Sequence, residues 1–288
     1  MYPAQFEYHV PGTLKEAIEL LGRHKDDAKL LAGGHSLIPA MKLRLAQPKH
    51  LVDLRKVPGL AGIKEDGGML VIGALTTHYA VESSPVVKGK CAVLAATAGQ
   101  IGDPLVRNLG TIGGSLAHAD PAADYPAAII ACGAEMVAEG PKGRRTIKAD
   151  DFFKGLLTTA LAGDEVLVEV RVPVCGPNVG ANYQKFPHPA SRFAVAGVAA
   201  VLTMNGGKVE RAGIGVTGAG SKAIRAKGVE AALAGKAPDA ATIQAAADKA
   251  ADGVDVQADL QGSEDYKRHL VKVMARRAIE AAAAQVTK

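Results

Sequence analysis

Leu31-Ala-Gly-Gly-His-Ser36 and Asn108-Leu-Gly-Thr-Ile-Gly-Gly-Ser115 are the two stretches on which the fold prediction depends. In each, adjacent glycines lie close to a hydroxyl residue, so that successive backbone N–H groups can meet an anion without an intervening Cβ. Residues 29–32 are typical of a short buried strand, and residues 36–45 are typical of a helix with Ser36 available as its N-cap. A loop of free amides before a helix favours phosphate. Together the stretches predict that main-chain amides hold a pyrophosphate.

The second stretch continues into an alanine-rich segment that carries two carboxylates, Asp120 and Asp124. An acid at Asp124 could accept hydrogen bonds from a polyol, although a surface or helix-capping acid would look the same. Each glycine stretch alone is also compatible with an ordinary tight turn. Their occurrence as a pair is what favours a binding site.

Both stretches resemble known cofactor signatures. Ala32-Gly-Gly-His-Ser36 followed by Pro39-Ala-Met-Lys42, and Thr111-Ile-Gly-Gly114 followed by Asp120-Pro-Ala-Ala-Asp124, are similar to the two FAD signatures of the molybdenum hydroxylase (xanthine dehydrogenase) family. Nearly the whole chain resembles the separate FAD-binding medium subunit found in carbon monoxide dehydrogenase and related heterotrimers. The resemblance implies an α+β fold with a two-lobed FAD-binding domain of the vanillyl-alcohol-oxidase/PCMH type. A small C-terminal domain with an antiparallel sheet and helices is expected to follow.

The resemblance also implies roles for individual residues. It places the two signatures at the FAD pyrophosphate and ribityl region, Asp124 at the ribityl hydroxyls, and Ile101 and Phe193 around the isoalloxazine ring. Leu167 and Lys185 align with further cofactor contacts, where a core leucine and a solvated lysine are the alternatives. The implied cofactor-binding residues are therefore Ala32, Gly33, Gly34, His35, Ser36, Ile101, Gly110, Thr111, Ile112, Gly113, Gly114, Asp124, Leu167, Lys185 and Phe193.

His35 has three interpretations. It could hydrogen-bond the cofactor or present only its backbone N–H, and it could also be a loop histidine without a role. Covalent flavin attachment, as in the berberine-bridge oxidases that also use Gly-Gly-His, is disfavoured because this chain lacks a comparable substrate domain. We therefore expect non-covalent FAD, no catalytic side chain and no metal ligand in this chain, since no Ser/His/Asp, metal-binding histidine or Walker pattern occurs.

Composition narrows the class of protein. The chain has 288 residues, of which 48% are hydrophobic, so that a buried core is expected and disorder is excluded. The net charge of +5 is spread along the chain, and aromatic residues make up only 4%, which argues against nucleic-acid binding. The three cysteines (Cys91, Cys132 and Cys175) form no Cys-x-x-Cys pair and are too few to hold an iron–sulfur cluster. Any cluster must come from another chain.

The N-terminal sequence has neither the basic nor the apolar region of a signal peptide, and no apolar run approaches the ~20 residues that span a bilayer. We therefore expect a cytoplasmic protein without a membrane span.

The chain in order predicts two domains. Residues 14–22 form a helix capped by Thr13 and ended by Gly22, and residues 50–54 close a β–loop–α–β unit that makes lobe 1–56. Lobe 57–176 contains short strands and short helices. The period-two run 165–173 is its clearest strand. The elements expected in this lobe are strands at 60–64, 69–73, 135–139 and 165–173, and helices at 75–82 and 92–98, with a further segment at 127–131.

The Gly/Pro segment 175–180 is the domain boundary, so that the FAD-binding domain spans 1–176 and the C-terminal domain spans 177–288. Strands 193–204 and 208–217 form a hairpin around Asn205-Gly-Gly207. Helices are expected near 226–234, 240–251 and 263–285. Gly213-Ile-Gly-Val-Thr-Gly218 matches a dinucleotide fingerprint, but a strand runs through its glycines, and no βαβ unit surrounds it.

The resemblance predicts an FAD-carrying subunit that passes electrons from [2Fe–2S] clusters in a small partner subunit to an external acceptor. A large molybdopterin subunit would oxidise the substrate, and the complex would be a dimer of heterotrimers. Two alternatives stay open: a stand-alone FAD-dependent reductase or oxidase, and a nucleotide-binding assembly factor. The sequence names neither the substrate nor the acceptor.

Overall fold

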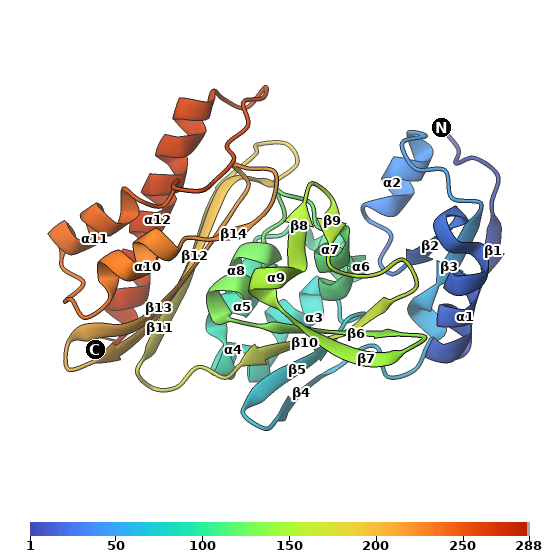
Figure 1. The fold of residues 1–288 in the computed structure, drawn as a ribbon, viewed down its shortest axis with the longest axis horizontal. Coiled ribbons are helices and arrows are strands. Elements are labelled where there is room, and N and C mark those ends of the chain that lie inside the picture. Colours follow the sequence, from blue (N-terminus) through green and yellow to red (C-terminus); the bar gives the residue numbers. More distant parts are fainter. Residues whose placement is uncertain (287–288) are drawn as a thin grey trace.

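The N-terminal lobe is a small parallel sheet with a helix packed on it. The computed structural model describes residues 1–286, and Figure 1 shows this lobe, in blue, at one end of an elongated molecule. Its strands lie in the order β1-β3-β2 and are all parallel. Its elements are β1 (Glu7–His9), α1 (Leu14–His24), the 3-10 turn η1 (Lys25–Asp27), β2 (Ala28–Leu31), α2 (Leu37–Lys42), β3 (His50–Asp53) and the 3-10 turn η2 (Leu54–Lys56).

The predicted β–loop–α–β unit is confirmed as β2, the loop 32–36, α2 and β3. Two details of the helices were predicted wrongly. Gly22 does not end α1. The helix continues to His24, and the backbone leaves the helical conformation at Lys25, where φ is 47°. The helix predicted for 36–45 is shorter, and the Ser36 side chain makes no capping hydrogen bond. Thr13 does cap α1, since its Oγ1 accepts from the Glu16 N–H at 3.2 Å.

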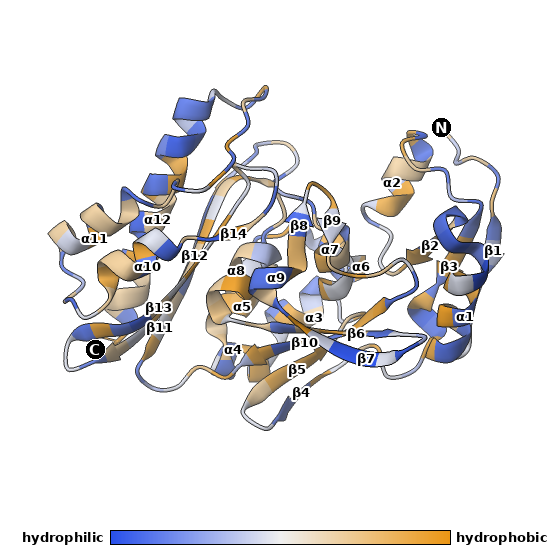
Figure 2. Cartoon of the chain, viewed as in Figure 1, coloured by the Kyte–Doolittle hydropathy of each residue, from blue (hydrophilic) through white to orange (hydrophobic). Residues whose placement is uncertain are grey.

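The second lobe contains a five-stranded antiparallel sheet in the order β4-β5-β10-β6-β7. The predicted strand 165–173 is confirmed as the central strand β10. Figure 2 shows the hydrophilic edge strand β7 beside the more apolar inner strands. The elements of this lobe are β4 (Ile63–Asp66), β5 (Met69–Gly73), α3 (His78–Ser83), α4 (Pro85–Lys90), α5 (Ala92–Gly99), α6 (Pro104–Leu109), α7 (Ile112–His118), α8 (Tyr125–Cys132), β6 (Glu135–Gly140), β7 (Gly143–Lys148), α9 (Ala149–Phe152), β8 (Phe153–Gly155), β9 (Thr158–Thr159) and β10 (Val166–Pro173).

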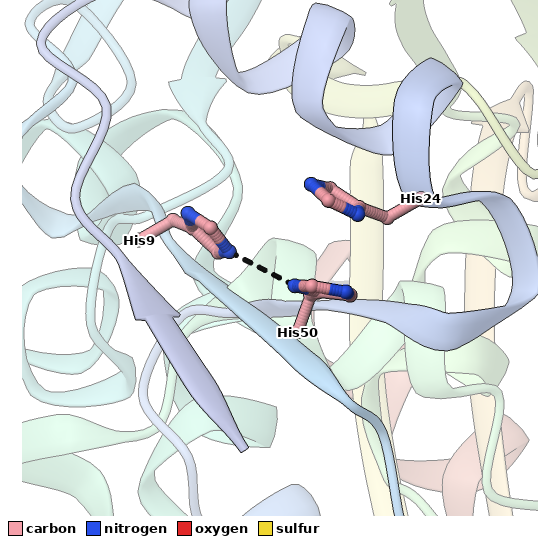
Figure 3. Close-up of side chains that lie close together, drawn as sticks. All are labelled: His9, His24 and His50. Carbon is pink, nitrogen blue, oxygen red and sulfur yellow. Dashed lines mark hydrogen bonds between the residues drawn. The ribbon is translucent and has the colours of Figure 1, made fainter.

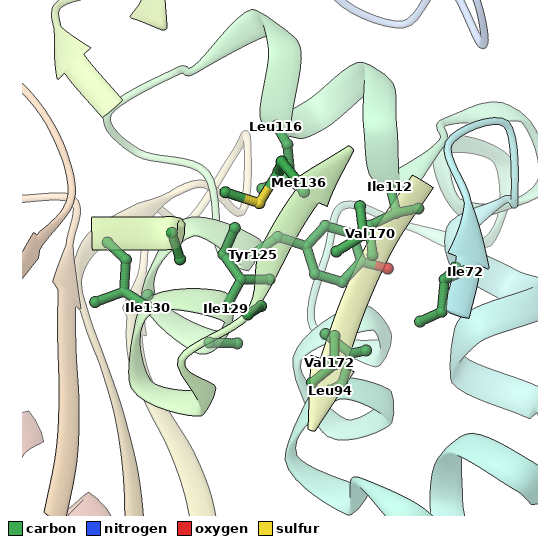
Figure 4. Packing of buried hydrophobic residues seen from close by; sticks show 14 of the residues in the cluster. Ile72, Leu94, Ile112, Leu116, Tyr125, Ile129, Ile130, Met136, Val170 and Val172 are labelled. Atoms are coloured by element: carbon green, nitrogen blue, oxygen red, sulfur yellow. The ribbon is translucent and has the colours of Figure 1, made fainter. Parts of the chain in front are cut away.

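The core of the second lobe lies between this sheet and helices α5, α7 and α8. Figure 4 shows the Tyr125 ring at the centre of it, between Ile112 of α7 and Val170 of β10. All three side chains are fully buried. Burial of a large apolar side chain contributes roughly 1.5–3 kcal/mol, so this cluster fixes α7 and α8 against the sheet.

The C-terminal domain has a four-stranded antiparallel sheet in the order β11-β12-β13-β14, with α12 packed along β11 and β12. The predicted hairpin is confirmed. Gly206 and Gly207 form its turn with φ of 57° and 73°, which suits a two-residue hairpin connection. The elements are β11 (Val179–Pro187), β12 (Ala194–Asn205), β13 (Lys208–Thr217), β14 (Ile224–Arg225), α10 (Lys227–Leu233), α11 (Ala240–Ala247) and α12 (Glu264–Val286).

The sheet of the C-terminal domain packs directly on α8 of the second lobe. A Cβ at Gly213 would lie 2.0 Å from the Ala131 carbonyl oxygen, and one at Gly215 would lie 2.0 Å from that of Ala127. These glycines therefore allow close contact between β13 and α8. The interpretation of 213–218 as a strand and not a nucleotide loop is confirmed, because β13 passes through both positions and pairs with β12 and β14.

The three cysteines, distant in sequence, gather where the second lobe meets the C-terminal domain. The Cys91 and Cys132 sulfur atoms are 3.8 Å apart, and all three thiols are free. Hydrogen bonding with Cys132 and burial raise the pKa of Cys91 well above its usual value. The Cys91 thiol is therefore held protonated and is a poor nucleophile.

Within residues 1–286, no helix has the length and apolar character needed to cross a membrane.

Candidate functional site

The first glycine-rich stretch presents free main-chain amides, as predicted. It connects β2 to α2, and the backbone turns at Gly34, where φ is 75°. Within the described part of the chain, the N–H groups of Gly33, Gly34, His35 and Ser36 donate to no acceptor. The side chains of His35 and Ser36 are exposed. An anion can therefore approach a row of unpaired donors at this loop.

The second glycine-rich stretch differs in part from the prediction, because the amides of residues 112–114 are already paired. Ile112 N–H donates to the Thr76 carbonyl at 3.0 Å, and Gly113 N–H donates to the Ala74 carbonyl at 2.9 Å. Gly114 N–H donates to the Thr111 side chain at 3.1 Å. Residues 112–118 form helix α7 with Thr111 as its N-cap. The prediction of free amides is therefore wrong for residues 112–114, whereas the Thr111 N–H donates to no acceptor within residues 1–286.

The glycines of this stretch instead permit close packing. A Cβ at Gly113 would lie 2.4 Å from the Ala74 Cβ and 2.7 Å from its carbonyl oxygen. A Cβ at Gly110 would lie 2.6 Å from Nε2 of His78. Real Cβ atoms do not approach other atoms so closely, so alanine at Gly113 would displace the Ala74 backbone and alanine at Gly110 would displace the His78 ring.

The structure brings the two stretches into main-chain contact. A Cβ at Gly33 would lie 2.1 Å from the Leu109 carbonyl oxygen and 2.8 Å from the Gly110 Cα. On the other side, a Cβ at Gly114 would be 3.6 Å from the Cβ of Ala32. The convergence expected for a shared cofactor cradle is therefore present, and residues from both lobes form it. Four free donors come from the first lobe, and within the described residues the Thr111 N–H of the second lobe is also free.

Sequence reasoning missed two buried polar side chains beneath this contact. His78 of α3 is 4% exposed and Tyr125 of α8 is fully buried. Their rings lie 5.3 Å apart. Among the described residues, neither the His78 Nδ1 nor the Tyr125 hydroxyl has a hydrogen-bond partner. Unpaired buried polar atoms are rare, and next to Gly110 they fit a site that is completed by a bound polar group or water.

We expect His78 to make the protein sensitive to mild acid. Burial, followed by the charges of His35 and Arg107, lowers its pKa from 6.5 to about 4. Below pH 6.5 the unfolded chain binds a proton that the folded chain rejects. The free energy of unfolding should therefore fall from pH 6.5 to about pH 4 by on the order of 3 kcal/mol through this residue. Urea unfolding at pH 7 and pH 4.5 should show a smaller loss for His78→Asn than for the parent. An equal loss in both proteins would contradict this assignment, and exposed His269→Asn is the matched control.

Asp124 and Lys185 form a buried ion pair between the two domains. Oδ2 of Asp124 lies 3.0 Å from Nζ of Lys185, and the side chains are 4% and 2% exposed. The Tyr183 hydroxyl donates to Oδ1 of Asp124, and Lys185 also donates to the Gln100 carbonyl at 2.8 Å. Burial raises the pKa of Asp124 and lowers that of Lys185, while each charge favours the ionised form of the other. The predicted ribityl acceptor thus already accepts one bond at each oxygen, and any polyol would share it with Lys185 and Tyr183.

Three predicted apolar contacts lie in different settings. Ile101 is half-buried after α5, and its carbonyl accepts from Arg107 at 3.1 Å. Phe193 is 42% exposed and precedes Ala194, whose N–H donates to the Ala122 carbonyl near Asp124. Leu167 is 5% exposed in the core of the second lobe, which is the alternative that the sequence had left open.

The predicted cofactor-binding residues fall into two groups, and buried residues lie between these groups. The first group is 32–36 with 110–114, and the second is Ile101, Asp124, Lys185 and Phe193, with Gln100 joined to Lys185. Between them, Gly110 touches His78, His78 contacts the Tyr125 ring, and Tyr125 follows Asp124 in sequence. The path runs through the second lobe and links the loop 32–36 of the first lobe to Lys185 of the C-terminal domain.

Comparison with known proteins gives a consistent result over both domains. Residues 4–175 match the family model described as the FAD binding domain in molybdopterin dehydrogenase, and residues 181–282 match the CO dehydrogenase flavoprotein C-terminal domain. The carbon monoxide dehydrogenase medium chain of Hydrogenophaga pseudoflava is 46% identical over 98% of each chain. That of Afipia carboxidovorans is 40% identical over 99% of each chain. The solved structure of the H. pseudoflava enzyme lacking the Mo-pyranopterin moiety contains a chain that matches with a TM-score of 0.97 over 99% of both chains.

Proposed function

Because this chain belongs to the family of FAD-binding medium chains of carbon monoxide dehydrogenase and related molybdenum hydroxylases, we propose that it holds one FAD non-covalently and transfers electrons within such a complex. Electrons would arrive from the iron–sulfur clusters of a small partner subunit and leave to an external acceptor. The observation that carries the proposal is the main-chain contact between Gly33 and residues 109–110, with four unpaired amides beside it. The flavin, when bound, supplies the one- and two-electron redox chemistry.

The chain's own residues would hold the cofactor in defined ways. The amides of Gly33, Gly34, His35 and Ser36 would donate to the pyrophosphate, because no protein acceptor in residues 1–286 competes for them. Gly110 and Gly113 act differently, by allowing close packing against His78 and Ala74 within the second lobe. Thr111 has its hydroxyl committed to the Gly114 amide, so it positions α7. Contacts with the rest of the FAD molecule stay predictions for Asp124, Lys185, Ile101 and Phe193.

We place partner subunits over apolar side chains that this chain leaves exposed. Two of these side chains, Leu43 and Leu45, follow α2. Two more, Leu105 and Leu109, lie on α6, and Leu157 lies between β8 and β9. Each is more than half exposed. Burial of such side chains is a usual contribution of permanent subunit interfaces. The partners would be the small iron–sulfur and large molybdopterin subunits in a dimer of heterotrimers, and the cytoplasmic location likewise stays a prediction.

The two alternatives that the sequence left open make different predictions. A stand-alone reductase or oxidase would turn over an organic substrate without partners. An assembly factor would bind a nucleotide without transferring electrons. The similarity over both domains, including the small C-terminal one, favours the medium-chain role over either alternative.

Purified protein is expected to be yellow and to contain one FAD per chain, released by acid precipitation. The isolated chain should not be reduced by carbon monoxide, an aldehyde or an N-heterocycle. The complex recovered with its co-purifying subunits should be bleached by the correct one of these substrates. A colourless folded chain that gains no flavin from added FAD would contradict the cofactor assignment. Bleaching of the isolated chain by such a substrate would contradict the subunit role.

A further inference from the structure

Three histidines that are distant in sequence meet on the N-terminal lobe. His9 lies in the edge strand β1, His24 ends α1, and His50 begins β3. Figure 3 shows the three rings turned toward one another, with a hydrogen bond between His9 and His50. No spacing motif marks them, and no metal ligand was therefore predicted in this chain. None of the three belongs to the glycine-rich stretches.

The nitrogen atoms are close enough to share an ion. One ring nitrogen from each histidine lies within 4.8 Å of the others. His9 Nε2 and His50 Nδ1 are 3.1 Å apart. Tetrahedral Zn²⁺ with nitrogen ligands at about 2.0–2.1 Å requires ligand atoms about 3.3 Å apart. The His9–His50 pair therefore already has the spacing of one edge of such a tetrahedron.

Glu7 supplies an oxygen with nearly the same spacing. Its Oε2 lies 3.2 Å from His50 Nδ1 and 3.8 Å from His9 Nε2. Strand pairing explains the proximity, because Glu7 lies opposite His50 in the parallel pair β1–β3. Glu7 Oε2, His9 Nε2 and His50 Nδ1 thus outline one triangular face of a tetrahedral site. The Glu7 side chain is 71% exposed, so it can adjust to a ligand.

A rotation of the His24 side chain would bring one of its ring nitrogens to the fourth ligand position of the tetrahedron. Its ring now stacks on that of His50, with centroids 3.6 Å apart. One of its ring nitrogens already lies within 4.8 Å of a ring nitrogen of His9 and of one of His50. Neutral imidazole is the form that binds metal.

We propose that Glu7, His9, His24 and His50 form a binding site for a divalent transition-metal ion of the Zn²⁺ class, with three imidazole nitrogens and one carboxylate oxygen as ligands. Imidazole ligands select Zn²⁺, Ni²⁺ or Cu²⁺ over Mg²⁺, which prefers an all-oxygen site. The ion would join the three-residue edge strand β1 to the end of α1 and to β3. Its role is therefore to stabilise the N-terminal lobe, and it is independent of the proposed electron transfer.

Calorimetric titration of the full chain, treated with EDTA and desalted, tests the site with ZnCl₂ and MgCl₂ as probes. We expect one Zn²⁺ per chain with a Kd below about 1 µM and no Mg²⁺ binding. His9→Gln and His50→Gln should each weaken Zn²⁺ binding at least tenfold, and the pair should abolish it. Added Zn²⁺ should also raise the unfolding temperature of the parent but not of the double variant.

Two further variants keep the test decisive. Glu7→Gln removes an exposed ligand without disturbing the packed core, and it should weaken Zn²⁺ binding several-fold while flavin content stays the same. His269→Gln removes an exposed histidine of α12 and should leave binding unchanged. No Zn²⁺ binding to the parent at 10 µM metal, or equal binding to the parent and to His9→Gln/His50→Gln, would overturn the proposal. Either result would leave the cluster as a stack of imidazole rings without a metal-binding role.

Discussion

Replacing Gly33 by alanine is expected to leave the purified protein with less than about a tenth of the FAD that the parent retains. The new Cβ would lie 2.1 Å from the Leu109 carbonyl oxygen and 2.8 Å from the Gly110 Cα. Both obstacles are backbone atoms, so no side-chain rotation relieves the clash. The first loop must move away from the second lobe, and its row of amides then no longer faces a common ligand. Flavin absorbance per mole of protein measures the effect.

A second glycine separates the loss of the cradle from a general effect of alanine. Gly163 is exposed, and a Cβ added there would meet no atom within 4 Å beyond its chain neighbours, so Gly163→Ala should keep full flavin content. Gly110→Ala, whose Cβ would meet Nε2 of His78 at 2.6 Å, should lose flavin like Gly33→Ala. Circular dichroism should confirm that the variants remain folded. Parental flavin content in folded Gly33→Ala would refute the role of the contact between the two loops.

Local sequence signals predicted the elements that depend on neighbouring residues. The Thr13 cap, the alternating strand at 166–173 and the Asn-Gly hairpin each involve residues close in the chain, and each is present in the structure. The helix end at Gly22 was predicted wrongly, because Leu20 and Leu21 pack in the core of the lobe and the helix continues past them. Strand β1 was missed because its three residues show no periodicity and gain their place by pairing with β3.

The sequence predicted only those properties of the site that depend on residues close together in the chain. The free amides of 33–36 follow from a glycine loop between a strand and a helix. The paired amides of 112–113 could not be foreseen, since their acceptors, Ala74 and Thr76, belong to a segment far away in sequence. The same limit applies to Asp124, whose partners come from the C-terminal domain, and to the three histidines of the N-terminal lobe. A sequence pattern reflects residues that are close together in the chain, whereas these contacts join distant residues that only folding brings together.

Removing one partner of the buried pair is expected to have the largest effect on stability. Lys185→Met keeps most of the apolar part of the side chain but leaves the Asp124 carboxylate buried, with only Tyr183 as a donor. The Gln100 carbonyl also loses the donor that it now has at 2.8 Å. Breaking such a pair typically costs about 3–5 kcal/mol. The free energy of unfolding from urea titration should fall by this amount.

An exposed pair of the same length provides the control. Lys49 and Asp27 are also 3.0 Å apart, but their side chains are 71% and 53% exposed. Lys49→Met should therefore cost less than about 1 kcal/mol. Adding Asp124→Asn to Lys185→Met removes the stranded charge while an oxygen still accepts from Tyr183, so the double variant should recover more than half of the loss. If Lys185→Met is no more destabilising than Lys49→Met, the pair does not hold the two domains together, and the contact of β13 with α8 at Gly213 and Gly215 must carry that role alone.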